Sequence, residues 1–472
     1  MKPTDIKDIA TLEDRLRSLT TDFRQSREFV RLQGMNEGET VSLDIKDFLT
    51  IGAIANADIL ETGKSGGGKT HLAKMAMNAF FGTGQYVNRT ITPGMNEEAF
   101  IDIDFGKIKG GATLKESIGT TPILTYPGVI LNEANRAPAL IQNILIPYLE
   151  YEFNIKGLDF AVGVELPKGQ RYQYRILTIN EGAEYKGIAE MDKAVRDRMV
   201  IEIPIDQFKS LKQDIRDMIK RRKSSAITVE KVDGSMTDTV IQLYQSIGSI
   251  PLSAMTSEFL VYLSGLSNCI KSSTGSKEGI AFTLDLCKGC HHAAEENNIC
   301  GSVYAPTNRS LINLQSVGKA VAAVRAYKSL VQIIQSAGSD SKKRITTKRF
   351  MESDYLKNLE VKPEDILALA PFILYSKIEV NSQWVKKIYQ GNKFAAVQGV
   401  INSAYGRFAK FYTDHQKDLV KCIVSWNQQG MLDFLQKYAK EKDAWMANIK
   451  DFENRSQDYD VEVADVIRGY EK

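Results

Sequence analysis

A glycine-rich segment near residue 63 has the residue types and the spacing needed to bind phosphate. It fits the pattern G-x-x-x-x-G-K-[ST] and consists of Gly63, Lys64, Ser65, Gly66, Gly67, Gly68, Lys69 and Thr70. Glycines allow a tight loop whose backbone N–H groups point at phosphate oxygens, and a following helix adds its positive end. Lys69 can reach the β- and γ-phosphates, and the Thr70 hydroxyl can ligate Mg²⁺. This Walker A pattern predicts binding of ATP with Mg²⁺. The alternative is a glycine-rich turn followed by a coincidental Lys-Thr pair.

A second segment supplies the polar groups that a P-loop hydrolase needs opposite its phosphate loop. The apolar run Val129–Leu131 is followed by Asn132 and Glu133. Glu133 stands where a carboxylate polarises the attacking water, and Asn132 stands where an aspartate is expected near Mg²⁺. An amide oxygen can accept from a metal-bound water but carries no charge, so we expect weaker metal binding and slower turnover. The alternative is that these residues only end a strand and cap the next helix.

Four of the five cysteines fall within one window of the sequence. They read C-x17-C-x2-C-x9-C and are Cys269, Cys287, Cys290 and Cys300. A C-x2-C pair can place two thiolates on one metal, and two further ligands complete a tetrahedron. The pattern predicts a structural Zn²⁺ site. His291 and His292 lie within the same window of the sequence. An iron–sulfur cluster would suit the same four thiolates, and buried thiols in a helical region are the third interpretation.

The hydrophobic pattern predicts the elements that position these groups. Between residues 46 and 207, the apolar runs Ala57–Leu60, Gly128–Leu131 and Tyr174–Leu177 alternate with helical segments. This alternation is typical of a parallel sheet covered by helices. A strand over Ile54–Leu60 would lead into the phosphate loop, and an amphipathic helix would lead out of it. The apolar stripe of that helix consists of Leu72, Met75, Ala76 and Ala79.

The length of 472 residues predicts about three domains, at roughly 150 residues each. We expect a helical lead-in over residues 1–45 and an α/β nucleotide-binding domain over 46–207. A helical lid with the cysteine cluster would follow over 208–380, with a surface loop at 336–343, and a C-terminal helical extension over 381–472. All three tryptophans lie in this extension, where they are either core residues or part of a docking surface for a partner.

Charge and hydropathy exclude several classes of protein. The 61 basic and 58 acidic residues give a net charge of +3, which makes no electrostatic case for a dedicated nucleic-acid binder. No apolar run approaches the roughly 20 residues that a membrane-spanning helix needs. We therefore expect a soluble, cytoplasmic protein without a membrane partner.

The run Val129–Pro138 resembles MoxR-type AAA+ ATPases of the helix-2-insert clade, in which the acidic strand end is followed by E-x-N-R-A-P. Further matches follow in the order that the family has, over about residues 50–378. They are a hairpin at Tyr151–Gly169, a sensor-1 strand at Ile176–Asn180, an arginine-finger segment at Tyr185–Met199, a sensor-2 segment at Pro306–Ser310 and a closing segment at Val361–Pro371. The chain departs from the family at Asn132, and at Lys64-Ser65, where the family commonly has prolines.

This resemblance implies an AAA+ core with a parallel sheet, a helical lid and a homo-hexameric ring. It implies ATP hydrolysis in which Lys69, Glu133 and Asn180 act within one subunit. Arg198, preferred to Arg196, would be the finger that reaches a neighbour's γ-phosphate, and Arg309 would be the sensor-2 residue. It also implies chaperone-like remodelling or activation of a protein partner, in the family often one with a von Willebrand A domain.

Two alternative functions stay open at this point. One is a ring motor associated with nucleic acid, for which the inserted hairpin offers few basic residues. The other is a slowly hydrolysing or non-hydrolysing nucleotide switch, which the neutral Asn132 motivates.

Overall fold

The protein is described from a computed structural model. The described residues are 1–19, 30–34, 39–96, 99–155, 157–181, 191–207, 216, 234–264, 306–337, 340–378, 380, 382–406 and 408–409. The chain divides into two compact units, and each is treated separately. One comprises Met1–Leu252 with Asn313–Ile373, and the other comprises Ser253–Ile312 with Leu374–Lys472. The domain boundaries expected at residues 45, 207 and 380 stay predictions.

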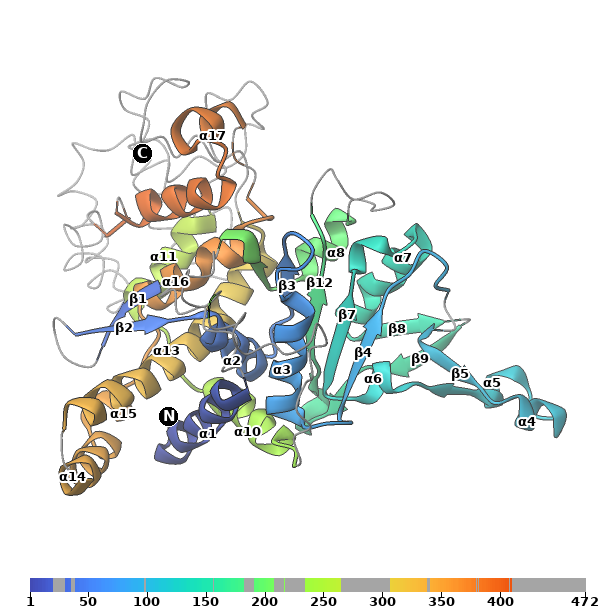
Figure 1. Cartoon of the computed structure of the whole chain (residues 1–472), viewed down its shortest axis with the longest axis horizontal. Coiled ribbons are helices and arrows are strands. Elements are labelled where there is room, and N and C mark those ends of the chain that lie inside the picture. The colour runs from blue at the N-terminus through green and yellow to red at the C-terminus, as the bar shows by residue number, and fades with distance from the viewer. Residues whose placement is uncertain are drawn as a thin grey trace, which may run out of the picture. The chain divides into compact units, whose positions relative to one another are not determined.

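A five-stranded parallel sheet forms the centre of the first unit (Figure 1). All four neighbouring pairs of strands are parallel, which confirms the expected parallel sheet. The strand order is β13 (Ile201–Pro204), β3 (Ile59–Thr62), β12 (Tyr174–Thr178), β7 (Gly128–Asn132) and β4 (Tyr86–Thr90). The three interior strands are buried along their whole length, because helices cover the sheet on both faces.

Two helices, α2 (Ile45–Ala55) and α3 (Lys69–Phe81), pack on one face of the sheet. The rings of Phe81 and Tyr174 lie 6.5 Å apart on that face, and a Cβ at Gly128 would clash with the Phe81 ring. The opposite face is covered by α7 (Ala139–Leu149), which joins a buried apolar cluster with β7 and β12. Outside α2 and α3, α1 (Pro3–Leu19) and α10 (Thr237–Ile247) complete the layer.

Small antiparallel hairpins extend from this core. They are β1–β2 (Val30–Gln33, Thr40–Leu43), β5–β6 (Ile101–Ile103, Ile118–Thr120), β8–β9 (Glu152–Ile155, Leu158–Ala161) and β10–β11 (Val164–Glu165, Arg171–Tyr172). The predicted hairpin at residues 151–169 is confirmed by β8–β9. The β5–β6 hairpin carries α4 (Phe105–Lys109) and α5 (Leu114–Ser117) away from the sheet (Figure 1). Short elements complete this part: α6 (Pro122–Thr125), η2 (Ala134–Arg136), η3 (Pro167–Gly169), α8 (Lys193–Arg198) and η4 (Ile205–Gln207).

The remaining helices are α11 (Ala254–Ser264), α13 (Asn308–Ser336), α14 (Asp340–Met351), α15 (Asp354–Lys357), α16 (Pro363–Leu374) and α17 (Ser382–Tyr389). They agree with the helical character predicted beyond residue 207. Within the first unit, Arg325 of α13 forms a buried ion pair with Asp365 of α16, at 2.7 Å between Nε and Oδ1. The described part of the chain has no helix that is long and apolar enough to cross a membrane.

Three predicted elements need correction. The strand expected over Ile54–Leu60 begins only at Ile59, because α2 continues to Ala55 and ends at Asn56 in the left-handed conformation (φ 51°). A short apolar run cannot distinguish the end of a buried helix from a strand, and asparagine tolerates this conformation. Among the described residues before position 45, only Pro3–Leu19 is helical, and β1 and β2 form a hairpin with alternating burial. The loop expected at 336–343 is shorter, because α14 begins at Asp340 and its lysines and arginines favour a helix.

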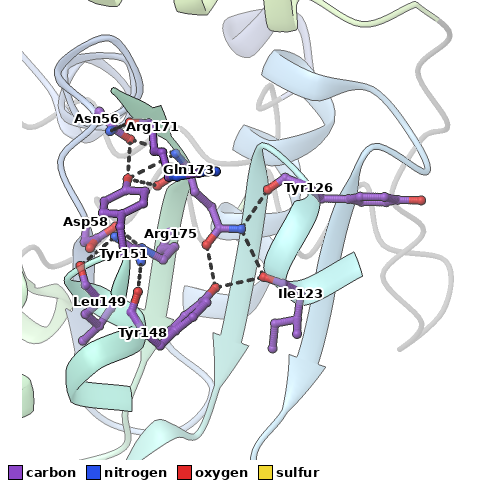
Figure 2. Close-up of polar contacts among 10 residues, drawn as sticks. All are labelled: Asn56, Asp58, Ile123, Tyr126, Tyr148, Leu149, Tyr151, Arg171, Gln173 and Arg175. Atoms are coloured by element: carbon purple, nitrogen blue, oxygen red, sulfur yellow. Dashed lines mark hydrogen bonds and ion pairs between the residues drawn. The ribbon is translucent and has the colours of Figure 1, made fainter. Parts of the chain in front are cut away.

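A buried polar network fastens α7 to the start of β12 (Figure 2). The Arg175 side chain is 1% exposed and donates from Nε to Asp58 Oδ1 at 2.8 Å. Its other two nitrogens donate to the carbonyls of Tyr148, at 2.7 Å, and Leu149, at 3.0 Å. These carbonyls close the last turn of α7 and have no partner within the helix, so a cation there satisfies them and complements the helix dipole. Gln173 adds a second tie to α7, because its Oε1 accepts from the Tyr148 hydroxyl at 2.8 Å, and its Nε2 donates to the carbonyls of Ile123 and Tyr126.

Candidate nucleotide-binding site

The glycine-rich loop leaves β3 at the carboxyl edge of the sheet and enters α3 at Lys69. Gly68 precedes this helix with a φ of 86°, and Gly63 has a φ of 137°, conformations that side chains rarely adopt. A Cβ at Gly63 would lie 3.0 Å from Asp206 Oδ1. The loop is held at that point, because the Lys64 N–H donates to Asp206 Oδ2 at 2.9 Å. The loop therefore has the position and backbone that phosphate binding requires.

Lys69 lies in the centre of this loop and is 6% exposed. Its Nζ donates to the carbonyls of Gly63, at 2.8 Å, and Lys64, at 2.7 Å. Burial lowers the pKa of Lys69, and the carboxylates of Glu61, Asp206, Glu181 and Glu133 oppose this shift. Asp206 was not predicted as part of the site, because its place beside the loop depends on the pairing of β13 with β3.

Glu61 of β3 is a fully buried acid directly behind the loop. Neither of its carboxylate oxygens has a hydrogen-bond partner among the described residues. Burial raises the pKa of Glu61 to about 8, against the opposing effect of the Lys69 ammonium. This residue was not predicted from the sequence either, because it follows the apolar run at its end, where an acid commonly faces solvent.

The buried Glu61 predicts a pH-dependent gain in stability for Glu61→Gln. Between pH 4.5, the ordinary pKa, and about pH 8, native Glu61 holds a proton that the unfolded chain has lost. Wild-type stability therefore falls as pH rises through this window, by on the order of 3–5 kcal/mol. Glutamine does not titrate, so this pH-dependent loss is absent from the variant. Its gain in the free energy of unfolding over the wild type should be small at pH 5 and largest at pH 8. Urea unfolding at several pH values without nucleotide measures this, with Glu165→Gln as an exposed control. A stability difference that stays constant with pH would contradict it.

Asn132 and Glu133 lie where β7 ends, beside the loop. Glu133 adopts the left-handed conformation (φ 54°, ψ 41°), and its N–H donates to Thr178 Oγ1 at 3.3 Å. Its carboxylate pairs with Arg136, at 3.0 Å between Oε2 and Nε, and does not cap the following 3₁₀ turn. The strand ends at Asn132 as the alternative has it, but the Glu133 side chain makes no capping hydrogen bond. A non-glycine residue in this conformation costs about 1–2 kcal/mol, which is common at functional sites.

The sensor-1 candidate Asn180 follows β12 and is 9% exposed. Its carbonyl accepts from Asn135 Nδ2 at 2.9 Å, so the segment after Glu133 is bound to the end of β12. The next residue is bound to the phosphate loop, since the Glu181 N–H donates to the Gly63 carbonyl at 3.3 Å. The structure thus brings together four predicted groups: the glycine-rich loop, Asn132, Glu133 and Asn180.

The two arginine candidates have partners within their own chain. Arg196 pairs with Glu181, at 3.0 Å, and with Glu202. Arg198 pairs with Glu150 at the end of α7, at 3.1 Å, and donates to the Ala194 carbonyl. Arg196 is therefore bound to carboxylates near the phosphate loop, whereas Arg198 is bound to a carboxylate at the C-terminal end of α7. The assignment of Arg198 as the finger stays a prediction.

The remaining predicted residues belong to the second unit or lie outside the described residues. Arg309 is exposed near the start of α13 and belongs to the second unit, so its sensor-2 role stays a prediction. The cysteines of the predicted cluster and both nearby histidines lie outside the described residues. Within the described residues, no group of three or more His, Cys, Asp or Glu side chains could hold a metal ion. The zinc or iron–sulfur prediction is therefore untested.

The order of the parallel sheet and the glycine-rich loop between β3 and α3 define an α/β fold of the P-loop type. A solved structure shares this fold: the crystal structure of a proposed ATPase from Cytophaga hutchinsonii ATCC 33406. It superposes with a TM-score of 0.53 and 15% sequence identity, over 84% of this chain and 96% of that chain. No family model matches the sequence, and no curated protein matches it. The likeness establishes the fold, whereas the resemblance to MoxR-type ATPases rests on the sequence motifs alone.

Proposed function

We propose that this protein is an AAA+ ATPase that binds ATP with Mg²⁺ and hydrolyses it. The observation that carries the proposal is the convergence of the loop containing Lys69 with Glu133 and Asn180 at one edge of the sheet. Glu133 and Asn180 follow strands that lie far apart in the sequence. A glycine-rich turn that matched the pattern by chance would have no reason to lie beside both residues. The shared fold with a proposed ATPase supports the same conclusion.

Each of these side chains has a separate role in binding and hydrolysing ATP. Lys69 binds the β- and γ-phosphates, and the loop N–H groups hold their oxygens. Glu133 accepts the proton of the attacking water, and Asn180 orients that water. The two oxygen donors for Mg²⁺ are the Thr70 hydroxyl and the Asn132 amide, which is 5% exposed. They fit a metal that prefers oxygen ligands and keeps several waters, and bound Mg²⁺ would neutralise phosphate charge.

The finer part of the proposal concerns what hydrolysis drives. The motifs after residue 129 support a MoxR-like, homo-hexameric machine that remodels or activates a protein partner, with Arg198 completing the site of a neighbouring subunit. The neutral Asn132 supports a second candidate, a nucleotide switch with little or no turnover.

Steady-state turnover with Mg²⁺, measured for the wild type and for Glu133→Gln, tests the proposal. We expect wild-type turnover of about 0.1 per second or more, slow by enzyme standards because Asn132 carries no charge. Glu133→Gln should lower it about 100-fold, since a positioned base contributes at least that much, while ATP binding persists. Glu152→Gln, an exposed change on β8, is the control. Tight ATP binding without turnover above the Glu133→Gln background would favour the switch.

A further inference from the structure

The Asn132 amide is held between two neighbouring strands of the sheet. Its Nδ2 donates to Asn88 Oδ1 on β4 at 2.6 Å. Its Oδ1 accepts from Thr178 Oγ1 on β12 at 3.4 Å. The register pairs Leu177 with Leu131, so Thr178 and Asn132 are the next residues along the two strands, and Thr178 is only 2% exposed. One side chain from each flanking strand therefore contacts one end of this amide.

The direction of these hydrogen bonds follows from the backbone N–H of Glu133, which can only donate. The Glu133 backbone N–H donates to Thr178 Oγ1 at 3.3 Å. The hydroxyl proton of Thr178 is then available for Asn132, whose oxygen must face Thr178. The amide nitrogen of Asn132 must face Asn88, which presents its own oxygen. The orientation of the Asn132 amide is thus set by a backbone donor on the next residue.

We propose that Thr178 is a positioning residue that couples Glu133 to Asn132, and that Asn88 completes this coupling. The inference rests on the proposed function, in which Glu133 acts on water and Asn132 on the metal. Thr178 holds the Glu133 backbone in its left-handed conformation and keeps the Asn132 oxygen turned away from β4. Asn88 supplies the acceptor that an amide needs at this position, and which an aspartate would not need.

The hydrogen bonds of Asn132 with Asn88 and Thr178 also explain how a neutral residue is accommodated at position 132. Aspartate there would present two acceptors, so Asn88 would have to turn its amide and offer its nitrogen in place of its oxygen. With asparagine, each contact pairs one donor with one acceptor, so the buried amide has partners at both ends. Asn132 and Asn88 are therefore matched to each other.

The first test replaces Thr178 by valine, which keeps the shape of the side chain and removes the hydroxyl. The part-buried Glu133 N–H then loses its acceptor and the Glu133 backbone is no longer held in place, so we expect kcat to fall at least about tenfold. ATP affinity should change less than about threefold, because the phosphate loop is untouched. Thr178→Ser keeps the hydroxyl and should restore most of kcat. Equal kcat in the valine variant and the wild type, or equal losses in the valine and serine variants, would overturn the inference.

The second test uses carboxylates at the two asparagine positions. In Asn88→Asp/Asn132→Asp, two acceptors face each other, whereas either single change leaves a donor available from the remaining amide. We expect the double variant to turn over at least about tenfold more slowly than either single variant, a coupling typical of residues in contact. Turnover equal to that of the slower single variant would contradict the proposed contact.

A binding measurement separates failure of this inference from failure of the proposed function. If the wild type shows no turnover above Glu133→Gln, the ATPase proposal fails, and the ratio of ATP affinities with and without Mg²⁺ becomes the readout. Thr178→Val should then lower this ratio at least about threefold, and Thr178→Ser should restore it. An unchanged ratio in the valine variant would overturn the inference independently of hydrolysis. Thermal melting of each variant checks that it folds.

Discussion

Replacing Lys69 by methionine should abolish ATP turnover and weaken ATP binding. The Lys69 side chain is nearly buried at the start of α3, with Nζ directed at two loop carbonyls, so its charge is fixed at the centre of the phosphate loop. Methionine keeps the length of the side chain and removes the charge and the donors. Loss of one preorganised donor commonly costs about 100- to 1,000-fold in kcat, and we expect at least this much for Lys69→Met.

Two measurements check this prediction. Calorimetric titration with ATP and Mg²⁺ should show at least a tenfold loss of affinity, and a phosphate-release assay should show turnover at background. Lys74→Met is the matched control, because Lys74 lies on the same helix five residues later. ATP binding of Lys69→Met equal to that of the wild type would show that the loop does not bind phosphate.

Replacing Arg175 by methionine should strongly destabilise the folded protein. The variant leaves Asp58 as a buried carboxylate without its cation, and it removes the Arg175 donors from the carbonyls of Tyr148 and Leu149, of which Tyr148 keeps the Tyr151 N–H. Breaking a buried ion pair by removing one partner costs about 3–5 kcal/mol. Adding Asp58→Asn should recover part of this loss, because the uncompensated charge is then gone.

Denaturant unfolding at neutral pH measures the effect of Arg175→Met. Arg171→Met is the matched control, since Arg171 pairs with the exposed Glu165 at 3.8 Å. Surface pairs of that kind contribute about 0–1 kcal/mol. A loss of stability for Arg175→Met no larger than that for Arg171→Met would contradict the role given to the buried network.

The elements around the phosphate loop could be predicted because their signals are local. The strands β7 and β12 were found from apolar runs, and α3 was found from its stripe and from the loop before it. Asn132, Glu133 and Asn180 could be placed at one edge because the carboxyl ends of parallel strands share an edge. Local signals failed at Asn56. The apolar residues before it were predicted to begin a strand, but they are the end of helix α2.

The groups that the sequence did not reveal depend on which strands are neighbours. Thr178 lies between Glu61 and Asn132 only because β12 is inserted between β3 and β7. Asp206 reaches the loop only because β13 pairs with β3. Strand order is a long-range property, so no local pattern identifies Thr178, Glu61 and Asp206 as parts of one site. The left-handed conformation of Glu133 likewise follows from its tertiary contacts and not from its residue type.

The strand order also determines when this site can form during synthesis on the ribosome. The strand β3 pairs on both sides with strands made much later, since Ile59 lies beside Ile176 and Ile201. At the usual elongation rates of about 5–20 residues per second, β3 waits on the order of ten seconds for its second neighbour. Until then its unpaired edges are exposed, and the loop lacks its contacts to Asp206 and Glu181. The nascent chain therefore gains a complete nucleotide site only after Asp206 has left the ribosome.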